Sequence, residues 1–202
     1  MNGHKILVDL LKDSKYGSKE QAIASLTYFT NPETIKSINN KNIFKIIRNS
    51  SKRGVMTNEY MYDNNFCVHD IFCWANKLRK YDLRDIQFNH IYSDPNSISK
   101  YTCLSNIVLT PSFLAKLTDT DKEIIYLLKY RAYKIYTYNP DNINFIKPKN
   151  YDKLNWQDFL PKNENIKDIF EQVIKKNKKN KAVLSINKYG WVFNDFMPLG
   201  SK

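Results

Sequence analysis

A chain of 202 residues, 42% of them hydrophobic, is long enough to bury the core of one domain, and this composition excludes wholesale disorder. Lys and Arg outnumber Asp and Glu by 32 to 20, and the formal net charge is +12. The positive excess lies in residues 1–80 and 141–202, whereas 81–140 is nearly neutral. A basic surface of this size favours polyanions, above all double-stranded DNA, and a homodimer is possible. The alternative is an ordinary lysine-rich protein from an AT-rich genome.

No stretch of the sequence approaches the roughly 18 apolar residues of a membrane-spanning helix. The first residues lack the pattern of a signal peptide. The three cysteines, Cys67, Cys73 and Cys103, include no C-x-x-C pair, which disfavours a disulfide scaffold or a structural zinc site. We therefore expect a cytoplasmic, reduced protein with no membrane partner, in which Cys67 and Cys73 are small buried side chains.

Short helices are predicted in the first fifty residues. Ser18 is a suitable N-cap for a helix over 19–29, and Asn31 followed by Pro32 starts a second helix. The spacing of isoleucines predicts a third helix over 42–54. Its end carries three candidate DNA-binding residues, which are Arg48, Lys52 and Arg53. Three short helices, the last of which ends in basic residues, fit either a helix-turn-helix element or a small helical bundle.

Strands are predicted in the middle of the chain. Alternation around Asp63-Asn64 predicts a β-hairpin over 55–68, and a helix over 69–81 follows, with His69 as a packing or capping residue. The alternating segment 85–92 places His90 on one strand face with Ile86 and Phe88. A polar loop then leads to a second strand over 104–111.

Helices are predicted after the second strand. A short helix over 112–117 precedes the capping-box spacing of Thr120 and Glu123, which starts a long helix at about 121–136. Asn139-Pro140 should stop it. One face of this helix is basic and aromatic, and either contacts phosphates or is merely solvated; it comprises Lys122, Tyr126, Lys129 and Tyr133.

The last sixty residues predict a basic accessory region. An amphipathic helix around 166–173 leads into a run of lysines that are candidate DNA contacts, and 182–193 is a strand candidate. The run comprises Lys175, Lys176, Lys178, Lys179 and Lys181.

The segment from 85 to 136 resembles the HNH nuclease family, which has a ββα-metal fold. The matching residues are Asn89-His90-Ile91 and, after the loop, Leu104 to Leu109 with Asn106. The resemblance implies that His90 is a general base that activates water and that Asn106 braces the loop carrying it. It also implies that Asn89 and a residue of the following helix hold one divalent ion, most simply Mg²⁺. The residue nine positions after Asn106 is Ala115, which cannot bind a metal, so Asp119 is the candidate second ligand.

These observations predict an α+β fold with a small antiparallel ββα-metal-like core. The N-terminal region over 1–84 would be helical with a hairpin, the HNH-like core would span 85–140, and 141–202 would be a basic accessory region. We expect the three regions to form one compact unit. The predicted function is a metal-dependent DNA endonuclease of restriction or mobile-element type. The alternatives are a catalytically inactive nucleic-acid-binding or inhibitor protein on the same fold, or a coincidence in which His90 is a core histidine and Asn106 a turn residue.

Overall fold

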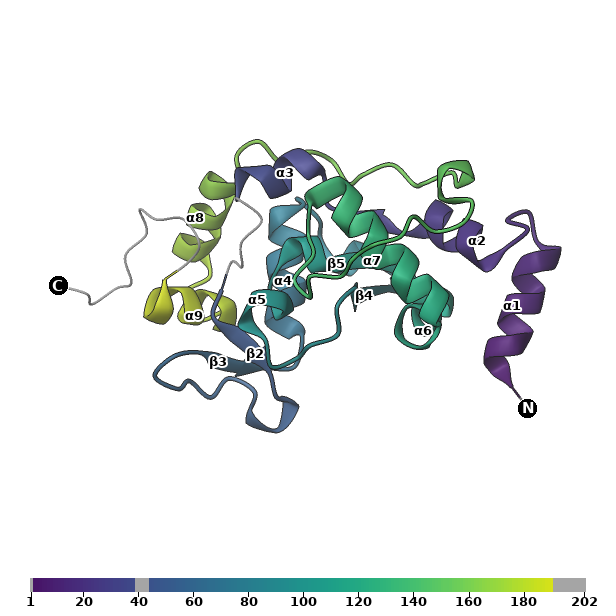
Figure 1. The fold of residues 1–202 in the computed structure, drawn as a ribbon. Helices are drawn as coiled ribbons and strands as arrows, with labels where there is room; N and C mark the ends of the chain where they lie inside the picture. Colours follow the sequence, from purple (N-terminus) through teal and green to yellow (C-terminus); the bar gives the residue numbers. More distant parts are fainter. Residues whose placement is uncertain (1, 39–43, 191–202) are drawn as a thin grey trace.

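The structure, a computed structural model, describes residues 2–38 and 44–190, and these residues form a mixed α+β fold, as predicted (Figure 1). The α-helices are α1 (Gly3–Asp13), α2 (Lys19–Leu26), α3 (Pro32–Ser37), α4 (Phe66–Ala75), α5 (Ile98–Tyr101), α6 (Ser112–Thr120), α7 (Lys122–Tyr136), α8 (Ile166–Lys176) and α9 (Lys181–Tyr189). The strands are β1 (Tyr28–Phe29), β2 (Ile46–Arg48), β3 (Met61–Asp63), β4 (Ile86–His90) and β5 (Ile107–Pro111). Short 3₁₀ turns are η1 (Ser50–Lys52), η2 (Lys80–Asp82), η3 (Leu104–Asn106) and η4 (Tyr151–Lys153).

A three-stranded antiparallel sheet holds the centre of the fold, in the order β1-β5-β4. β4 and β5 pair along their whole length, and His90 at the end of β4 lies opposite Ile107 at the start of β5. The antiparallel pairing of the strands predicted at 85–92 and 104–111 is therefore confirmed, although both strands are shorter than expected.

Both faces of β5 are covered. Its consecutive residues from Ile107 to Thr110 are all buried, and side chains of neighbouring strand residues point to opposite faces. On one side Phe72 of α4 meets Phe88 of β4 edge to face, with ring centroids 5.6 Å apart. Figure 1 shows α4 and α7 flanking these strands. The continuous apolar sequence of β5 follows from this double coverage.

The helix starts depend on side-chain caps. Ser18 accepts a hydrogen bond from the backbone N–H of Gln21, 3.1 Å away, which confirms it as the N-cap of α2. The cap of α7 is Asp121 and not Thr120, because the Asp121 carboxylate accepts bonds from the two backbone N–H groups of Glu123 and Ile124. α7 ends at Tyr136, before the predicted stop at Asn139-Pro140.

The helix predicted over 42–54 is wrong. Residues 42 and 43 lie outside the described part of the chain, and the remaining residues do not form an α-helix. Ile46 to Arg48 form β2, and a 3₁₀ turn follows. Two neighbouring β-branched residues, Ile46 and Ile47, are both buried, and a short apolar run does not distinguish helix from strand by its spacing. Without this third helix, the helix-turn-helix interpretation has no recognition element in this segment.

The hairpin predicted around Asp63-Asn64 is also wrong. β3 pairs in parallel with β2, and Asp63 lies opposite Arg48. The Asp63 side chain accepts a hydrogen bond from the N–H of Cys67 in α4. Asp63-Asn64 therefore connects β3 to α4 and is not the turn of a hairpin. α4 consequently begins at Phe66 and ends at Ala75, earlier at both ends than the predicted helix over 69–81.

The chain after residue 140 is joined to the first half of the protein. The amphipathic helix predicted at 166–173 is confirmed as α8, whereas the strand predicted over 182–193 is wrong where it is described, because α9 occupies it up to Tyr189. The N–H of Leu160 donates to the carbonyl of Phe29 at 2.9 Å, and the Asn163 amide donates to the carbonyl of Ala75 at 2.8 Å. One apolar cluster therefore extends from the N-terminal helices into α9.

The cysteines lie in the core, as predicted for Cys67 and Cys73. Cys67, Cys73 and Cys103 are buried thiols. Burial raises the pKa of the Cys73 thiol to about 11, so it stays protonated near neutral pH. Within 2–38 and 44–190, no helix has the length and apolarity to cross a bilayer.

Replacing Phe170 of α8 with alanine tests whether the C-terminal helices belong to the common core. Phe170 is fully buried and meets the rings of Phe44 and Trp74 edge to face. Phe170→Ala should lower the free energy of unfolding by about 3–5 kcal/mol, as for other buried aromatic truncations. The matched control is Phe113→Ala on α6, because Phe113 is 56% exposed. Chemical denaturation measures both variants, and equal small effects would contradict a shared core.

Candidate active site

His90 stands at the end of β4, where the chain leaves the sheet and makes a loop back to β5. The N–H of Ile91 donates to the carbonyl of Asn106 at 2.8 Å, and this bond extends the pairing of the two strands beyond the sheet by one step. The two ends of the loop are therefore adjacent, while its middle contains the short helix α5, which the predicted polar loop did not include.

The amide of Asn106 holds this loop closed. Its Oδ1 accepts from the N–H of Tyr92 at 2.7 Å, and its Nδ2 donates to the carbonyls of Tyr92 and Lys100, both at 3.0 Å. Asn106 is fully buried, so these bonds replace the water that its amide and the loop backbone would otherwise bind. The geometry is that of a loop brace, the role that the sequence resemblance implied for this residue.

Tyr101 fixes the orientation of the His90 ring. The rings of His90 and Tyr101 are stacked, with centroids 5.4 Å apart and planes 9° apart. The Nε2 atom of His90 lies 2.9 Å from the carbonyl oxygen of Tyr101. A carbonyl only accepts, so Nε2 carries a proton and Nδ1 of the neutral ring keeps its lone pair. His90 therefore has one nitrogen for anchoring and one for taking up a proton.

The surroundings of His90 keep its ring neutral. Burial lowers the pKa of His90, and the positive charge of Arg48 lowers it further, while the carbonyl of Tyr101 and the carboxylate of Asp119 oppose this shift. A neutral imidazole can accept a proton near pH 7, as a general base must.

A pocket of about 370 Å³ opens beside His90 and collects charged side chains from distant parts of the sequence. Arg48 comes from β2, Asp119 from α6 and Lys129 from α7. Lys100 of α5 and Asp141 of the segment after α7 complete the charged lining. The structure thus brings four residues predicted from the sequence to one place, and these are His90, Asp119, Arg48 and Lys129.

Two lysines of the pocket are already paired. Lys100 lies 2.6 Å from Asp141 and 3.3 Å from Asp94, and these carboxylates raise its pKa. Lys129 lies 3.9 Å from Asp141, and its ammonium stands 4.6 Å from the centroid of the Tyr92 ring. In the described part of the chain, Arg48 has no carboxylate within the 4.0 Å of an ion pair, so its charge faces the pocket uncompensated.

Asn89 does not join this pocket. It precedes His90 on β4 and therefore points to the opposite face of the sheet. Its side chain is buried there, and its Nδ2 donates to the hydroxyl of Thr110 at 2.6 Å. The structure does not bring Asn89 and Asp119 together as a pair of metal ligands.

The remaining donors fit only a metal bound together with substrate. Across residues 2–38 and 44–190, no group of three His, Cys, Asp or Glu side chains could hold an ion. Asp119 is an exposed carboxylate in the pocket, while Asp141 is engaged by lysines. Mg²⁺ is commonly bound through one or two carboxylates plus substrate phosphates and water. Asp119 is suited to that arrangement, and the described side chains do not supply a complete cage.

The basic-aromatic face predicted on α7 is covered only in part, because Tyr133 is still 39% exposed. The hydroxyl of Tyr126 exchanges hydrogen bonds with the backbone of Ile146, at 2.8 and 2.9 Å. Tyr133 stacks on Phe145, with centroids 5.1 Å apart. The extended segment after α7 thus occupies the tyrosines of this face. Lys122 remains exposed.

The other candidate DNA-binding residues lie outside the His90 pocket. Lys52 and Arg53 follow β2 and lie over the rings of Tyr62 and Phe66, respectively. The five lysines of the run from the end of α8 to the start of α9 are exposed; they are Lys175, Lys176, Lys178, Lys179 and Lys181. Neither group lines the pocket, so any contribution to DNA binding would be made from its surroundings.

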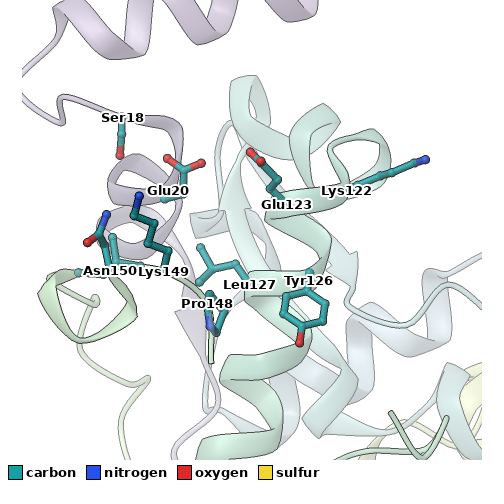
Figure 2. A pocket seen from close by; sticks show the side chains of 10 residues that line it. Ser18, Glu20, Lys122, Glu123, Tyr126, Leu127, Pro148, Lys149 and Asn150 are labelled. Carbon is teal, nitrogen blue, oxygen red and sulfur yellow. The ribbon is translucent and has the colours of Figure 1, made fainter. Parts of the chain in front are cut away.

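A second pocket of about 620 Å³ lies between α2, α7 and the segment at 148–154 (Figure 2). Leu127 and Pro148 lie at its centre, and Glu20 and Glu123 stand at its rim (Figure 2). Glu123 is also held by Lys19, 2.6 Å away. The ten lining residues include no histidine or cysteine, so this pocket lacks the neutral base that the His90 pocket has.

Tyr101, Lys100 and Asp141 are site residues that sequence reasoning missed. Tyr101 acts through its backbone carbonyl and its ring, neither of which its residue type reveals. Asp141 reaches the pocket only because the chain turns back after α7, and no local pattern indicates that contact.

Comparisons of the chain with protein-family models, with curated proteins and with solved structures gave no match. Function is therefore inferred from the geometry and charges of the pocket.

Replacing Asn106 with alanine should destabilise the protein more than the same change at Asn89. Asn106→Ala removes three hydrogen bonds and leaves buried loop groups without partners, which should cost about 2–4 kcal/mol. Asn89→Ala removes one short bond, to Thr110, and one long bond of 3.4 Å, to the carbonyl of Gln87, and should cost about 1 kcal/mol. Thermal and chemical unfolding measure both. An Asn106→Ala variant as stable as Asn89→Ala would contradict the brace.

His69 should make stability depend on pH. It is stacked on Phe88, with centroids 4.1 Å apart, and this confirms the predicted packing histidine. Burial lowers the pKa of His69 to about 4, and Lys80 and His90 add to the shift. Because the unfolded chain binds this proton near pH 6.5, the stabilisation is present above that pH and is lost as the pH falls towards 4.

His69→Phe keeps an aromatic ring on Phe88 but removes the titration. Its free energy of unfolding should therefore fall less than that of the unmodified protein between pH 7 and pH 4.5, as measured by urea denaturation at each pH. Equal losses in the two proteins would show that His69 protonation does not contribute.

Proposed function

We propose that the protein is a DNA endonuclease of HNH-like type that hydrolyses phosphodiester bonds with the help of a divalent ion. Such an endonuclease would be of the restriction or mobile-element type. The observation that carries the proposal is the anchoring of His90. Its Nε2 is bound to the Tyr101 carbonyl, which leaves Nδ1 as an acceptor. His90 lines a pocket with Asp119 and with Arg48, which has no ion-pair partner among the described residues. A core histidine needs no such pocket.

His90 would act as the general base. Its Nδ1 takes a proton from a water molecule, the water oxygen forms a bond to phosphorus, and the bond from phosphorus to the leaving sugar oxygen breaks. The guanidinium of Arg48 suits two non-bridging oxygens of the phosphate, because its N–H groups match such anions in pairs. Asn106 keeps the His90 loop in register with β5 during the reaction.

Asp119 is the residue that would hold the divalent ion, most simply Mg²⁺, together with phosphate oxygens of the substrate. The ion would supply positive charge to the leaving oxygen.

The rival function is a catalytically inactive protein that binds nucleic acid or inhibits a partner on the same fold. One observation favours it: the Asn89 side chain binds Thr110 and does not line the pocket, so of the two predicted metal ligands only Asp119 is in place. The two functions differ in whether a bound phosphodiester is broken.

Plasmid cleavage separates them. The unmodified protein with Mg²⁺ or Mn²⁺ should nick supercoiled plasmid, and EDTA should stop the nicking. His90→Ala should reduce the rate by roughly 10²- to 10⁴-fold, the usual contribution of a general base, and should leave DNA binding nearly unchanged. His4→Ala is the matched control, since His4 lies on α1 and lines neither pocket.

Circular dichroism and thermal unfolding would check that His90→Ala is folded. A folded, fully active His90→Ala protein would contradict the proposal. DNA binding by the unmodified protein without any metal-dependent nicking would favour the rival.

A further inference from the structure

An exposed phenylalanine with two cations on it lies next to the His90 pocket. Phe66 is the first residue of α4 and is 45% exposed, whereas most apolar residues of that helix are buried. The guanidinium carbon of Arg53 lies 4.9 Å from the centroid of its ring, and the Lys80 ammonium lies 3.6 Å from it. An exposed aromatic ring with adjacent cations is the combination that proteins use to hold single-stranded nucleic acid.

The position of this cluster is fixed relative to His90. Asn65, which precedes Phe66, lines a small cavity of about 50 Å³ together with Arg48, His90 and Tyr101. The N–H of Asn65 donates to the hydroxyl of Tyr101 at 2.8 Å, and that same tyrosine carries the His90 ring on its face. Phe66 therefore directly follows a residue that lines the same cavity as His90.

Arg48 and Arg53, the two arginines nearest Asn65 and Phe66, have no carboxylate partner within residues 2–38 and 44–190. Like Arg48, Arg53 has no carboxylate within ion-pair distance among the residues that the structure describes. Lys80, by contrast, is paired with Asp70 at 3.3 Å. Arginine side chains contact phosphates in pairs of hydrogen bonds and also stack on bases. An uncompensated arginine at each end of Asn65-Phe66 is suited to successive phosphates of one strand.

We propose that Phe66, Arg53 and Lys80 form a site for an unpaired nucleotide adjacent to the phosphodiester bond that is hydrolysed beside His90. The base stacks on the Phe66 ring or on the Arg53 plane above it, and Arg48 and Arg53 contact the phosphates on either side. Bases inside a duplex are covered by their neighbours, so only a single-stranded or splayed segment can offer a base face to Phe66. The placement beside the cleaved bond rests on the proposed function, whereas binding at Phe66 does not.

Binding is measured by fluorescence anisotropy at one fixed salt concentration, in the His90→Ala background so that hydrolysis does not consume the probe. The probes are a labelled single-stranded DNA oligonucleotide and a blunt duplex of the same sequence. The single strand should bind more tightly. Phe66→Leu should weaken its binding at least about fivefold, the lower end of what one stacked base contributes, and should hardly affect the duplex. Arg53→Gln should weaken both.

Phe113→Leu is the matched control, because Phe113 is also exposed but lies on α6 and lines neither the His90 pocket nor the adjoining cavity. Preferential binding of the duplex, or equal binding of Phe66→Leu and Phe113→Leu to the single strand, would overturn the inference, as would the absence of binding to both probes. Phe66-dependent binding by a protein that cleaves nothing would overturn the proposed endonuclease and support this site.

Discussion

The buried amide of Asn106 is the contact on which the arrangement around His90 depends. It joins the first residues of the loop after β4 to the last ones before β5, and through the carbonyl of Lys100 it also holds α5. α5 in turn ends at Tyr101, whose carbonyl and ring fix His90. The hydrogen bonds of this one side chain therefore give the connection between β4 and β5, residues 91–106, a defined conformation. The position of the proton acceptor follows from backbone geometry more than from neighbouring side chains.

The charged side chains of the pocket fall into two groups, one held in ion pairs and one without ion-pair partners among the described residues. Lys100, Lys129 and the two carboxylates Asp94 and Asp141 compensate one another and hold the segment after α7 against α5. Arg48 and Asp119 form no ion pair within the described residues, and they lie in the pocket with His90. An incoming phosphodiester would therefore meet an acceptor, a free cation and a free carboxylate without first breaking an ion pair.

The sequence allowed the central pair of strands and several helix starts to be predicted, because their signals are local. Ser18 and Asn31 cap helices, and alternation around Phe88 identifies β4. The errors arose where tertiary contacts decided the outcome. Ile46 and Ile47 follow Ile43 at helical spacing in the sequence, but in the structure they pair in parallel with β3. Asn89 matched a motif position, yet the alternation of the strand turns it towards Thr110. The His90–Tyr101 contact could not be predicted, since it depends on how a loop of low periodicity closes.

The extended segment before α8 has a consequence for the order in which the molecule can assemble. Leu160 binds the carbonyl of Phe29 on the edge strand β1, and Asn163 binds the end of α4. These contacts join residues separated by about half the chain or more, so closing them carries a large loop entropy. A chain still emerging from the ribosome would have made β4, β5 and α7 long before residue 160 appeared. Until then the outer edge of β1 and the end of α4 would lack these backbone partners, and the nascent protein would be open to association through that edge.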